Sequence, residues 1–156
     1  MNDLCRRAGA MFVMNDRADF AGMLGSGLHL GQDDLPVASA RPLLGPDQMI
    51  GLSTHNEAQF REALRQPVNY VALGPMFRTK SKSNPDTEVG LRTLSRLRQL
   101  TSLPLVAIGG IGLPAAAAVL ASGADSIAVI SDLLPGEPGD LKALERRAVE
   151  WLKTVQ

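Results

Sequence analysis

The sequence predicts an α/β protein of the TIM (β/α)8 barrel family, here an incomplete barrel of about six βα units. Short apolar runs alternate with longer helix-like segments along the whole chain, which is the order of a parallel sheet covered by helices. Polar residues follow every apolar run, as in barrels whose active sites collect from all the loops after the strands. An open doubly wound sheet would instead carry a single glycine-rich turn after its first strand.

The predicted strands are short runs dominated by aliphatic residues, which suit strands buried by helices. They are Ala10 to Met14, Gly27 to Leu30, Met49 to Ser53, Tyr70 to Leu73, Leu105 to Ile108 and Ser126 to Ile130. The segments between them have helical character, and a helix-like fragment, Asn2 to Ala8, precedes the first strand. The predicted helices are Ala18 to Leu24, Val37 to Leu43, Glu57 to Gln66, Leu91 to Leu100, Pro114 to Ser122 and Leu141 to Val155.

Length and composition favour one soluble domain that spans residues 1–156. The 156 residues are 45% hydrophobic, enough for one sizeable core. Sixteen basic residues balance sixteen acidic residues, which argues against a broad nucleic-acid-binding surface. The single cysteine, Cys5, excludes an internal disulfide framework and a cysteine-based zinc site. Without a membrane-spanning run or a signal-type segment, the chain is predicted to be cytoplasmic.

Two segments at predicted strand ends indicate a split anion-binding site. Gly74 to Lys82 leaves a short strand and presents two hydroxyls and two ammonium groups, all within Thr79 to Lys82. Val106 to Ile111 ends a buried strand in two glycines, Gly109 and Gly110, just before a helix. Glycines let backbone N–H groups approach a phosphate, and the helix adds its positive N-terminal end. Barrels of this type place phosphate behind their last two strands, so the six units correspond to strands 3 to 8.

The acidic residues after the first two strands also have a structural interpretation. An Asn15-Asp16 pair ahead of a helix is usually an N-cap. Asp33 and Asp34 ahead of Pro36 fit a turn and a cap equally well.

The other polar candidates have the same two interpretations. Lys80 and Lys82 fit a solvated loop, and the Gly109-Gly110 turn fits tight packing as well as phosphate binding. Four further residues are interpreted as structural: His29 as a packed, hydrogen-bonded side chain, His55 as a loop or cap residue, and Cys5 and Trp151 as packing residues.

Six ordered motifs together resemble the thiamine phosphate synthase (thiamine-phosphate pyrophosphorylase) family. They are Asn15-Asp16-Arg17, His29 to Asp34, Gly51 to His55, Gly74 to Lys82, Ile108 to Ile111 and Ala128 to Ser131, in that family's order and spacing over essentially the whole chain. Family proteins begin with about two more βα units, including a Gln-x-Arg-x-Lys type segment that grips pyrophosphate. The chain is therefore expected to be truncated at its N-terminus relative to the family, and to have little synthase activity alone.

The resemblance implies a transferase of thiamine biosynthesis. The family condenses 4-amino-2-methyl-5-(diphosphooxymethyl)pyrimidine with a thiazole phosphate or its carboxylate, giving thiamine phosphate and pyrophosphate. Magnesium is the implied cofactor, and the implied partners are these small molecules, with neither nucleic acid nor membrane. Exposed edges of an unclosed sheet would favour a homo-oligomer.

The resemblance also implies roles for individual residues. Asp16 and Asp34 match the magnesium ligands, and Asn15 and Ser53 match contacts to the pyrimidine. Lys82 matches the cation on the pyrophosphate, so Lys82 and Ser53 are the predicted catalytic residues. The thiazole phosphate contacts implied are Thr79, Lys80, Ser81, Gly110, Ile130 and Ser131.

Two other functions remain open at this point. The related thiazole tautomerases share the barrel but lack the magnesium pair and rely on a histidine near the position of His55. Retention of Asp16 and Asp34 favours the synthase. The chain is alternatively an inactive phosphate-binding remnant, because the pyrophosphate-gripping segment has no counterpart in it.

Overall fold

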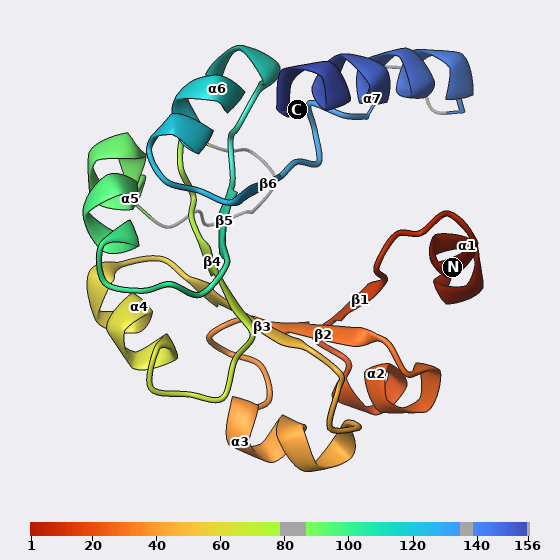
Figure 1. The fold of residues 1–156 in the computed structure, drawn as a ribbon, viewed down its shortest axis with the longest axis vertical. Helices are drawn as coiled ribbons and strands as arrows, with labels where there is room; N and C mark the ends of the chain where they lie inside the picture. Colours follow the sequence, from red (N-terminus) through yellow and green to blue (C-terminus); the bar gives the residue numbers. More distant parts are fainter. Residues whose placement is uncertain (79–86, 135–138, 156) are drawn as a thin grey trace. The chain divides into compact units, whose positions relative to one another are not determined.

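The structure is a computed structural model that describes residues 1–78, 87–134 and 139–155. Contacts between residues divide the chain into two compact units, Met1–Ala72 and Leu73–Gln156. In both units helices and strands alternate, as Figure 1 shows, which confirms the predicted α/β class.

The first unit holds the elements from the N-terminus to most of the fourth strand. They are α1 (Asn2–Arg7), β1 (Val13–Asn15), α2 (Ala18–Leu24), β2 (Gly27–Leu30), α3 (Val37–Ala40), the 3-10 helix η1 (Arg41–Leu43), β3 (Ile50–Thr54), α4 (Glu57–Ala63) and β4 (Tyr70–Leu73). Buried aliphatic residues on β2 and β3, such as Leu28, Leu30 and Ile50, pack with Phe60 of α4 to form its core.

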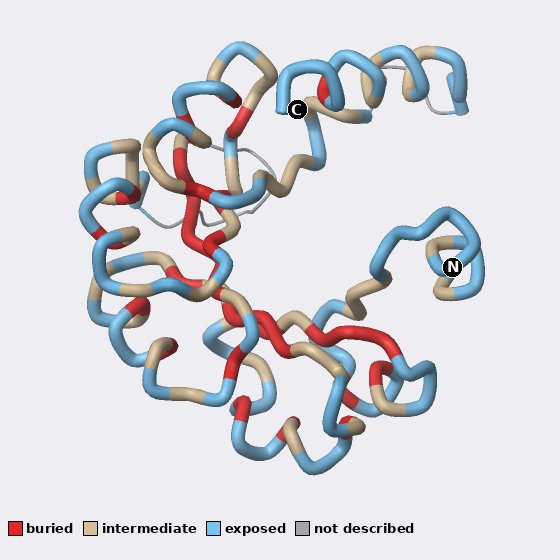
Figure 2. Tube along the Cα trace, viewed as in Figure 1, coloured by how far each residue is buried: buried red, intermediate tan, exposed pale blue. Residues whose placement is uncertain are grey.

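The second unit begins at the last residue of β4. Its elements are α5 (Gly90–Arg98), β5 (Leu105–Ile108), α6 (Leu113–Ala121), β6 (Ser126–Ala128) and α7 (Leu141–Val155). Leu94 and Leu97 of α5, Leu105 and Ala107 of β5 and Val119 of α6 are fully buried in this unit. The buried positions in Figure 2 concentrate on β2 to β5 and on one side of the helices α2 to α6, as an amphipathic pattern requires, whereas α1 has no buried residue.

The six strands are hydrogen-bonded in the order in which they occur in the chain. The pairs β1–β2, β2–β3 and β5–β6 are parallel. Asn15 lies opposite His29, and His29 lies opposite Gly51 on the next strand. The carboxyl ends of parallel strands lie at the same edge of a sheet, so this register brings the polar residues at the ends of three neighbouring strands together.

Some predicted boundaries were wrong at strand ends. β1 begins at Val13 rather than Ala10, because the Ala10 N–H donates to the Cys5 carbonyl and closes α1. β6 ends at Ala128 rather than Ile130, because the Ile130 carbonyl accepts from Leu133 and Leu134 in a turn.

Several predicted helices are also shorter than expected, among them α1, which ends at Arg7, and α5, which ends at Arg98. The segment 37–43 splits into α3 and η1, where Pro42 has no N–H for an α-helical bond. The helix that begins at Glu57 ends at Ala63, since Arg65 and Gln66 donate to carbonyls three residues back.

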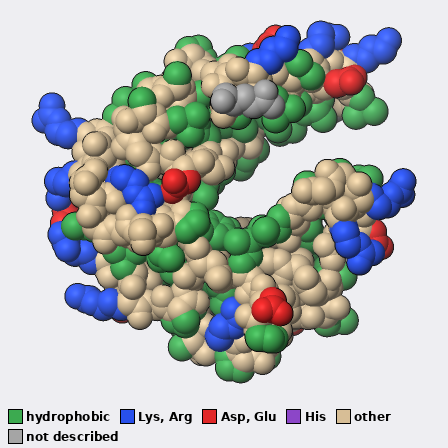
Figure 3. All heavy atoms as spheres, in the orientation of Figure 1, with side chains coloured by type: hydrophobic (Ala, Val, Ile, Leu, Met, Phe, Trp, Pro, Cys, Tyr) green, Lys and Arg blue, Asp and Glu red, His purple; other side chains and the backbone are tan. Residues whose placement is uncertain are grey.

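The described helices include none that combines the length and apolar character needed to cross a bilayer. On the face drawn in Figure 3, lysine and arginine side chains stand singly or in small groups among acidic and neutral ones.

Candidate active site

The first group of site residues lies where β1 and β2 end. Asn15 is the last residue of β1, and the Asp16 N–H donates to the His29 carbonyl on β2 at 2.9 Å. Asp16 has a φ of +63°, a left-handed conformation that Asp tolerates better than most residues. In this conformation its carboxyl is held beside the Asp34 carboxyl and the Asn15 side chain.

The pKa of Asp16 reflects this position. Partial burial and the hydrogen bond and negative charge of Asp34 raise the pKa of Asp16, and a hydrogen bond from Asn15 opposes the rise. Two carboxyls this close favour either a shared proton or a cation. In the described part of the chain no third His, Cys, Asp or Glu joins them in a group able to hold a metal.

The capping interpretation of Asp16 was wrong. The N-cap of α2 is Arg17, and no side chain caps that helix. The N-cap of α3 is Pro36, so Asp34 does not cap it either, but its Oδ2 accepts from the Gly31 N–H at 2.6 Å. The turn interpretation of Asp34 is therefore confirmed, and this turn holds the carboxyl near Asp16.

Ser53, predicted to contact the pyrimidine, is held from both sides. Its hydroxyl lies 2.8 Å from Nε2 of His29, and its carbonyl accepts from the Gln32 side chain at 2.6 Å. Nδ1 of His29 lies 2.8 Å from the Tyr70 hydroxyl. His29 is thus the hydrogen-bonded residue that was predicted, but its link to Ser53 and Tyr70 was missed. The alternation of apolar residues carries no sign of it.

The two segments of the predicted split anion site lie against each other within the second unit. Met76 N–H donates to the Ile108 carbonyl at 2.9 Å, and Phe77 N–H donates to the Gly109 carbonyl at 3.1 Å. Gly110 has a φ of +68°, and a Cβ there would lie 2.5 Å from the Phe77 carbonyl oxygen. Close packing alone thus explains why this position has no side chain. The predicted residues Thr79, Lys80, Ser81 and Lys82 lie outside the described residues.

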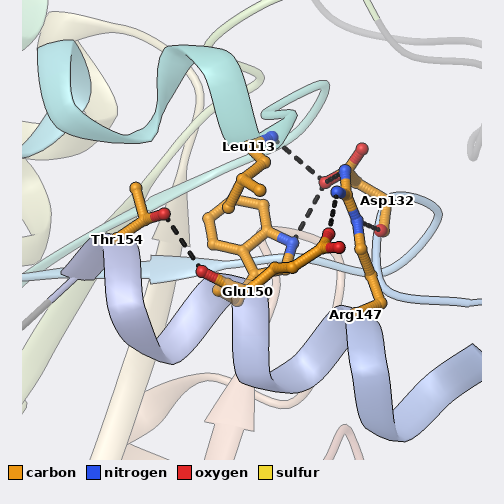
Figure 4. Close-up of polar contacts among 6 residues, drawn as sticks. Leu113, Asp132, Arg147, Glu150 and Thr154 are labelled. Atoms are coloured by element: carbon orange, nitrogen blue, oxygen red, sulfur yellow. Dashed lines mark hydrogen bonds and ion pairs between the residues drawn. The ribbon is translucent and has the colours of Figure 1, made fainter.

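Ile130 and Ser131 occupy the turn after β6, where both are exposed. Asp132 follows them and anchors the turn, as Figure 4 shows. One oxygen of its carboxylate, Oδ2, accepts from the Leu113 N–H at 3.0 Å and from the Trp151 indole at 3.0 Å. Arg147 donates to the same oxygen at 2.7 Å and to the Asp132 carbonyl at 2.9 Å.

This anchor was not predicted. The first N–H of α6, expected to help bind a phosphate, is instead paired with Asp132. Trp151 is buried, which confirms its structural interpretation. The sequence does contain one indication of it. Trp151 is the single tryptophan and lies on the apolar face of α7, and a buried indole N–H needs a hydrogen-bond acceptor.

His55 lies just before α4, as predicted for a loop residue. Its N–H donates to the Gln59 side chain at 2.7 Å, and the Asn56 side chain accepts from the Gln59 N–H at 3.0 Å. This reciprocal pair starts the helix in the manner of a capping box.

Comparison with known proteins gives a consistent result. The family described as thiamine monophosphate synthase matches residues 1–133. Thiamine-phosphate synthase of Koribacter versatilis is 53% identical over 123 residues, which are 78% of this chain and 58% of that protein. The Chloroflexus aurantiacus thiamine-phosphate synthase is 41% identical over 150 residues, which are 96% of this chain and 69% of that protein.

Solved structures agree. A thiamine phosphate pyrophosphorylase from Pyrococcus furiosus superposes with a TM-score of 0.85 at 31% identity, covering 98% of this chain and 71% of its own. A structure titled native KDPGal has a TM-score of 0.72 at 12% identity and shares the fold alone. The chain spans less than two thirds of the length of the Koribacter relative.

Proposed function

Because the chain belongs to the thiamine monophosphate synthase family, we propose that it joins the pyrimidine pyrophosphate to a thiazole phosphate in thiamine biosynthesis. Pyrophosphate leaves in this reaction, and thiamine phosphate is the product. The observation that carries the proposal is the meeting of the Asp16 and Asp34 carboxyls beside Asn15, at the ends of neighbouring strands.

The whole chain is assigned to one synthase-like domain. Residues 1–156 are proposed to be a TIM-type (β/α) domain whose six strands correspond to strands 3 to 8 of the barrel. The order of the strands and the superposition on the Pyrococcus protein support this assignment. Its proposed partners are the two small-molecule substrates.

Magnesium fits the pair of carboxyls. Mg²⁺ takes oxygen ligands, keeps several waters and is commonly held by one or two carboxylates together with substrate phosphates. Asp16 and Asp34 supply two such ligands. Burial and the neighbouring Asp34 carboxyl raise the pKa of Asp16, and a cation beside the pair would favour its charged form. When bound, the ion would neutralise negative charge on the departing pyrophosphate.

The remaining work is orientation and charge stabilisation by side chains. The bond between the pyrimidinylmethyl carbon and the pyrophosphate oxygen breaks, and a bond from the thiazole nitrogen to that carbon forms. Asn15 and Ser53 are proposed to hold the pyrimidine, and Lys82 to stabilise the leaving pyrophosphate. Alignment of two rings and preorganised charge are sufficient for a step of this kind.

The thiazole phosphate is assigned to the second unit. Gly110, Ile130 and Ser131 are proposed to contact it, together with Thr79, Lys80 and Ser81. Support comes from the hydrogen bonds of Met76 and Phe77 to the Ile108 and Gly109 carbonyls, which join the described parts of the two segments.

An assay of thiamine phosphate formation from the two substrates with Mg²⁺ tests the proposal. The wild-type chain should form product slowly, and this activity should be lost in Asp16→Asn, while the adjacent exchange Asp33→Asn should leave the rate unchanged. Calorimetry with each substrate separately addresses the other functions. An inactive remnant would bind the thiazole phosphate and not the pyrimidine pyrophosphate. A tautomerase would turn over a thiazole phosphate without metal, and either result would overturn the synthase assignment.

A further inference from the structure

His29 bridges two hydroxyl groups on neighbouring strands. It lies on β2, between Ser53 of β3 and Tyr70 of β4. Each ring nitrogen is 2.8 Å from one hydroxyl oxygen, Nδ1 from Tyr70 and Nε2 from Ser53. The imidazole and the phenol ring are stacked, with centroids 5.6 Å apart and planes 23° from parallel.

A glycine makes room for this arrangement. Gly51 is the register partner of His29 on β3, and a Cβ at Gly51 would lie 1.9 Å from Cζ of Tyr70. The Tyr70 ring therefore occupies the space that any other residue at position 51 would fill. The Gln32 amide, which donates to the Ser53 carbonyl, fixes the backbone on the other side of the site.

Two tautomers of a neutral His29 fit these distances, and each leaves one hydroxyl proton without a partner among the three side chains. Burial raises the pKa of Tyr70 to about 12, so the phenol keeps its proton at neutral pH. In the described part of the chain, the hydrogen-bond partner of the Tyr70 hydroxyl is Nδ1 of His29, at 2.8 Å. A charged imidazole would donate from both nitrogens and could not accept this proton.

A neutral imidazole has one donor and one acceptor. If Nδ1 accepts from Tyr70, the proton of His29 lies on Nε2 and is donated to the Ser53 oxygen. The Ser53 O–H is then left to donate to a bound molecule. In the opposite tautomer Ser53 would donate to Nε2 and the Tyr70 proton would be the one left over. We assign the first tautomer because a phenol is more acidic than an alcohol and is therefore the stronger hydrogen-bond donor.

We propose that His29 and Tyr70 are positioning residues that hold Ser53 as a hydrogen-bond donor, so that the site selects a substrate ring with an unprotonated nitrogen. This inference rests on the proposed function and names the substrate group that Ser53 recognises. A ring with C–H in place of that nitrogen would leave the Ser53 donor unpaired, which costs about tenfold or more in affinity.

The tautomer is testable without any substrate. The chain has two histidines, so ¹⁵N spectra of the imidazoles in the wild type and in His55→Gln assign the His29 signals. At neutral pH the His29 proton should be on Nε2, with Nδ1 bare. Tyr70→Phe should give a mixture of both tautomers. A proton on Nδ1 in the wild type would overturn the inference, whatever the chain binds.

Binding then tests the consequence for the substrate. Calorimetry compares the pyrimidine pyrophosphate with two analogues in which one or the other ring nitrogen is replaced by C–H. One analogue should bind the wild type about tenfold or more weakly. This difference should disappear in Ser53→Ala and shrink in Tyr70→Phe. It should persist in His29→Gln, whose amide N–H can take the place of Nε2–H.

The outcomes separate the two proposals. If the wild type binds the pyrimidine and both analogues equally, the inference is wrong and the proposed function stands. If Tyr70→Phe, shown by circular dichroism to be folded, keeps the full difference, Tyr70 does not position Ser53. If the wild type does not bind the pyrimidine pyrophosphate at all, the proposed function falls together with the role of Ser53 in it.

Discussion

Asp16 shows how much one residue of this chain depends on its backbone. Its φ of +63° turns the carboxyl toward Asp34 instead of onto the start of α2, where an N-cap would point. A non-glycine residue in this region carries some strain, and such strain tends to occur at functional sites. Here it brings together two acidic groups that repel each other unless a proton or cation is present.

The first prediction concerns the pH dependence of magnesium binding. Burial and Asp34 raise the pKa of Asp16, and a proton on this carboxyl competes with Mg²⁺. The affinity for Mg²⁺ should therefore fall as the pH drops through this raised pKa, at a higher pH than an ordinary aspartate would impose. Calorimetric titrations with Mg²⁺ at a series of pH values measure this affinity.

Without metal, the pH dependence of stability has the opposite direction to that of Mg²⁺ affinity. A raised pKa means that the folded state holds this proton more tightly than the unfolded state, so its contribution to stability is lost as the pH rises through that pKa. At a pH above this raised pKa, added Mg²⁺ should restore the thermal midpoint of unfolding.

Asp34→Asn should lower the pKa of Asp16 in carboxyl NMR titrations, and Asp33→Asn is the matched control. An unchanged Asp16 titration in Asp34→Asn would contradict the pairing.

At the scale of elements, α6 and α7 are held together through one carboxylate. Asp132 joins the first N–H of α6 to the indole and guanidinium of α7, so the turn after β6 and both helices share one anchor (Figure 4). Because Ser131 is the adjacent residue, this anchor also fixes the turn that is proposed to meet the thiazole phosphate.

The second prediction is that Asp132→Ala destabilises the chain more than the loss of an exposed cap. Its Leu113 and Trp151 partners would lose their acceptor, at a cost of about 2 kcal/mol in the free energy of unfolding. Asp140→Ala, which removes an exposed acceptor of the Ala143 N–H, should cost about 1 kcal/mol or less. Urea unfolding followed by circular dichroism measures the unfolding free energy of both variants. Equal losses in the two variants would mean that the hydrogen bonds of Asp132 contribute little to stability.

The third prediction tests the fit between β3 and β4. Gly51→Ala should displace the Tyr70 ring and break its hydrogen bond to His29, at about 1–3 kcal/mol of overpacking. Tyr70→Ala removes the obstacle, so Gly51→Ala should cost little in that background. A double-mutant cycle of unfolding free energies measures the coupling. If the losses in unfolding free energy from Gly51→Ala and Tyr70→Ala were additive, the two residues would not be in contact.

At the scale of the whole molecule, the proposed binding residues that the structure describes fall into two groups, one in each unit. Asn15, Asp16, Asp34 and Ser53 belong to the unit Met1–Ala72, and Gly110 and Ser131 belong to the unit Leu73–Gln156. The described contacts that hold each group in place come from its own unit.

The fourth prediction follows from this division. Gly110→Ala puts a Cβ at 2.5 Å from a backbone oxygen in a left-handed conformation, so no side-chain movement relieves it. It should weaken binding of the thiazole phosphate about tenfold or more. It should affect the pyrimidine pyrophosphate less, because Lys82 alone among the proposed contacts of that substrate belongs to this unit. Asp34→Asn, in contrast, should weaken only Mg²⁺-dependent binding of the pyrimidine pyrophosphate. Calorimetry with each substrate checks both variants. Equal losses of the two affinities in Gly110→Ala, or a loss of thiazole phosphate binding in Asp34→Asn, would contradict the separation.

Much of the secondary structure was predictable from local pattern. β2, β4, β5, α2 and α7 begin and end at the predicted residues, because long periodic segments and short aliphatic runs mark their own limits. The ends of β1 and β6 were not predictable in this way. Their apolar residues continue past the last ladder hydrogen bond, and only the competing turns at Ala10 and Ile130 stop the strands.

The sequence by itself determined the α/β class, the order of the elements and the family, since motif order and aliphatic periodicity are properties of the chain alone. Only the tertiary structure decided which polar groups meet. His29 and Tyr70 are 41 residues apart, and Asp132 and Trp151 are 19 apart. Such pairs depend on strand register and helix docking. The pattern of apolar residues in a strand or helix predicts which of its faces is buried. It does not predict which polar side chain of another element lies against that face.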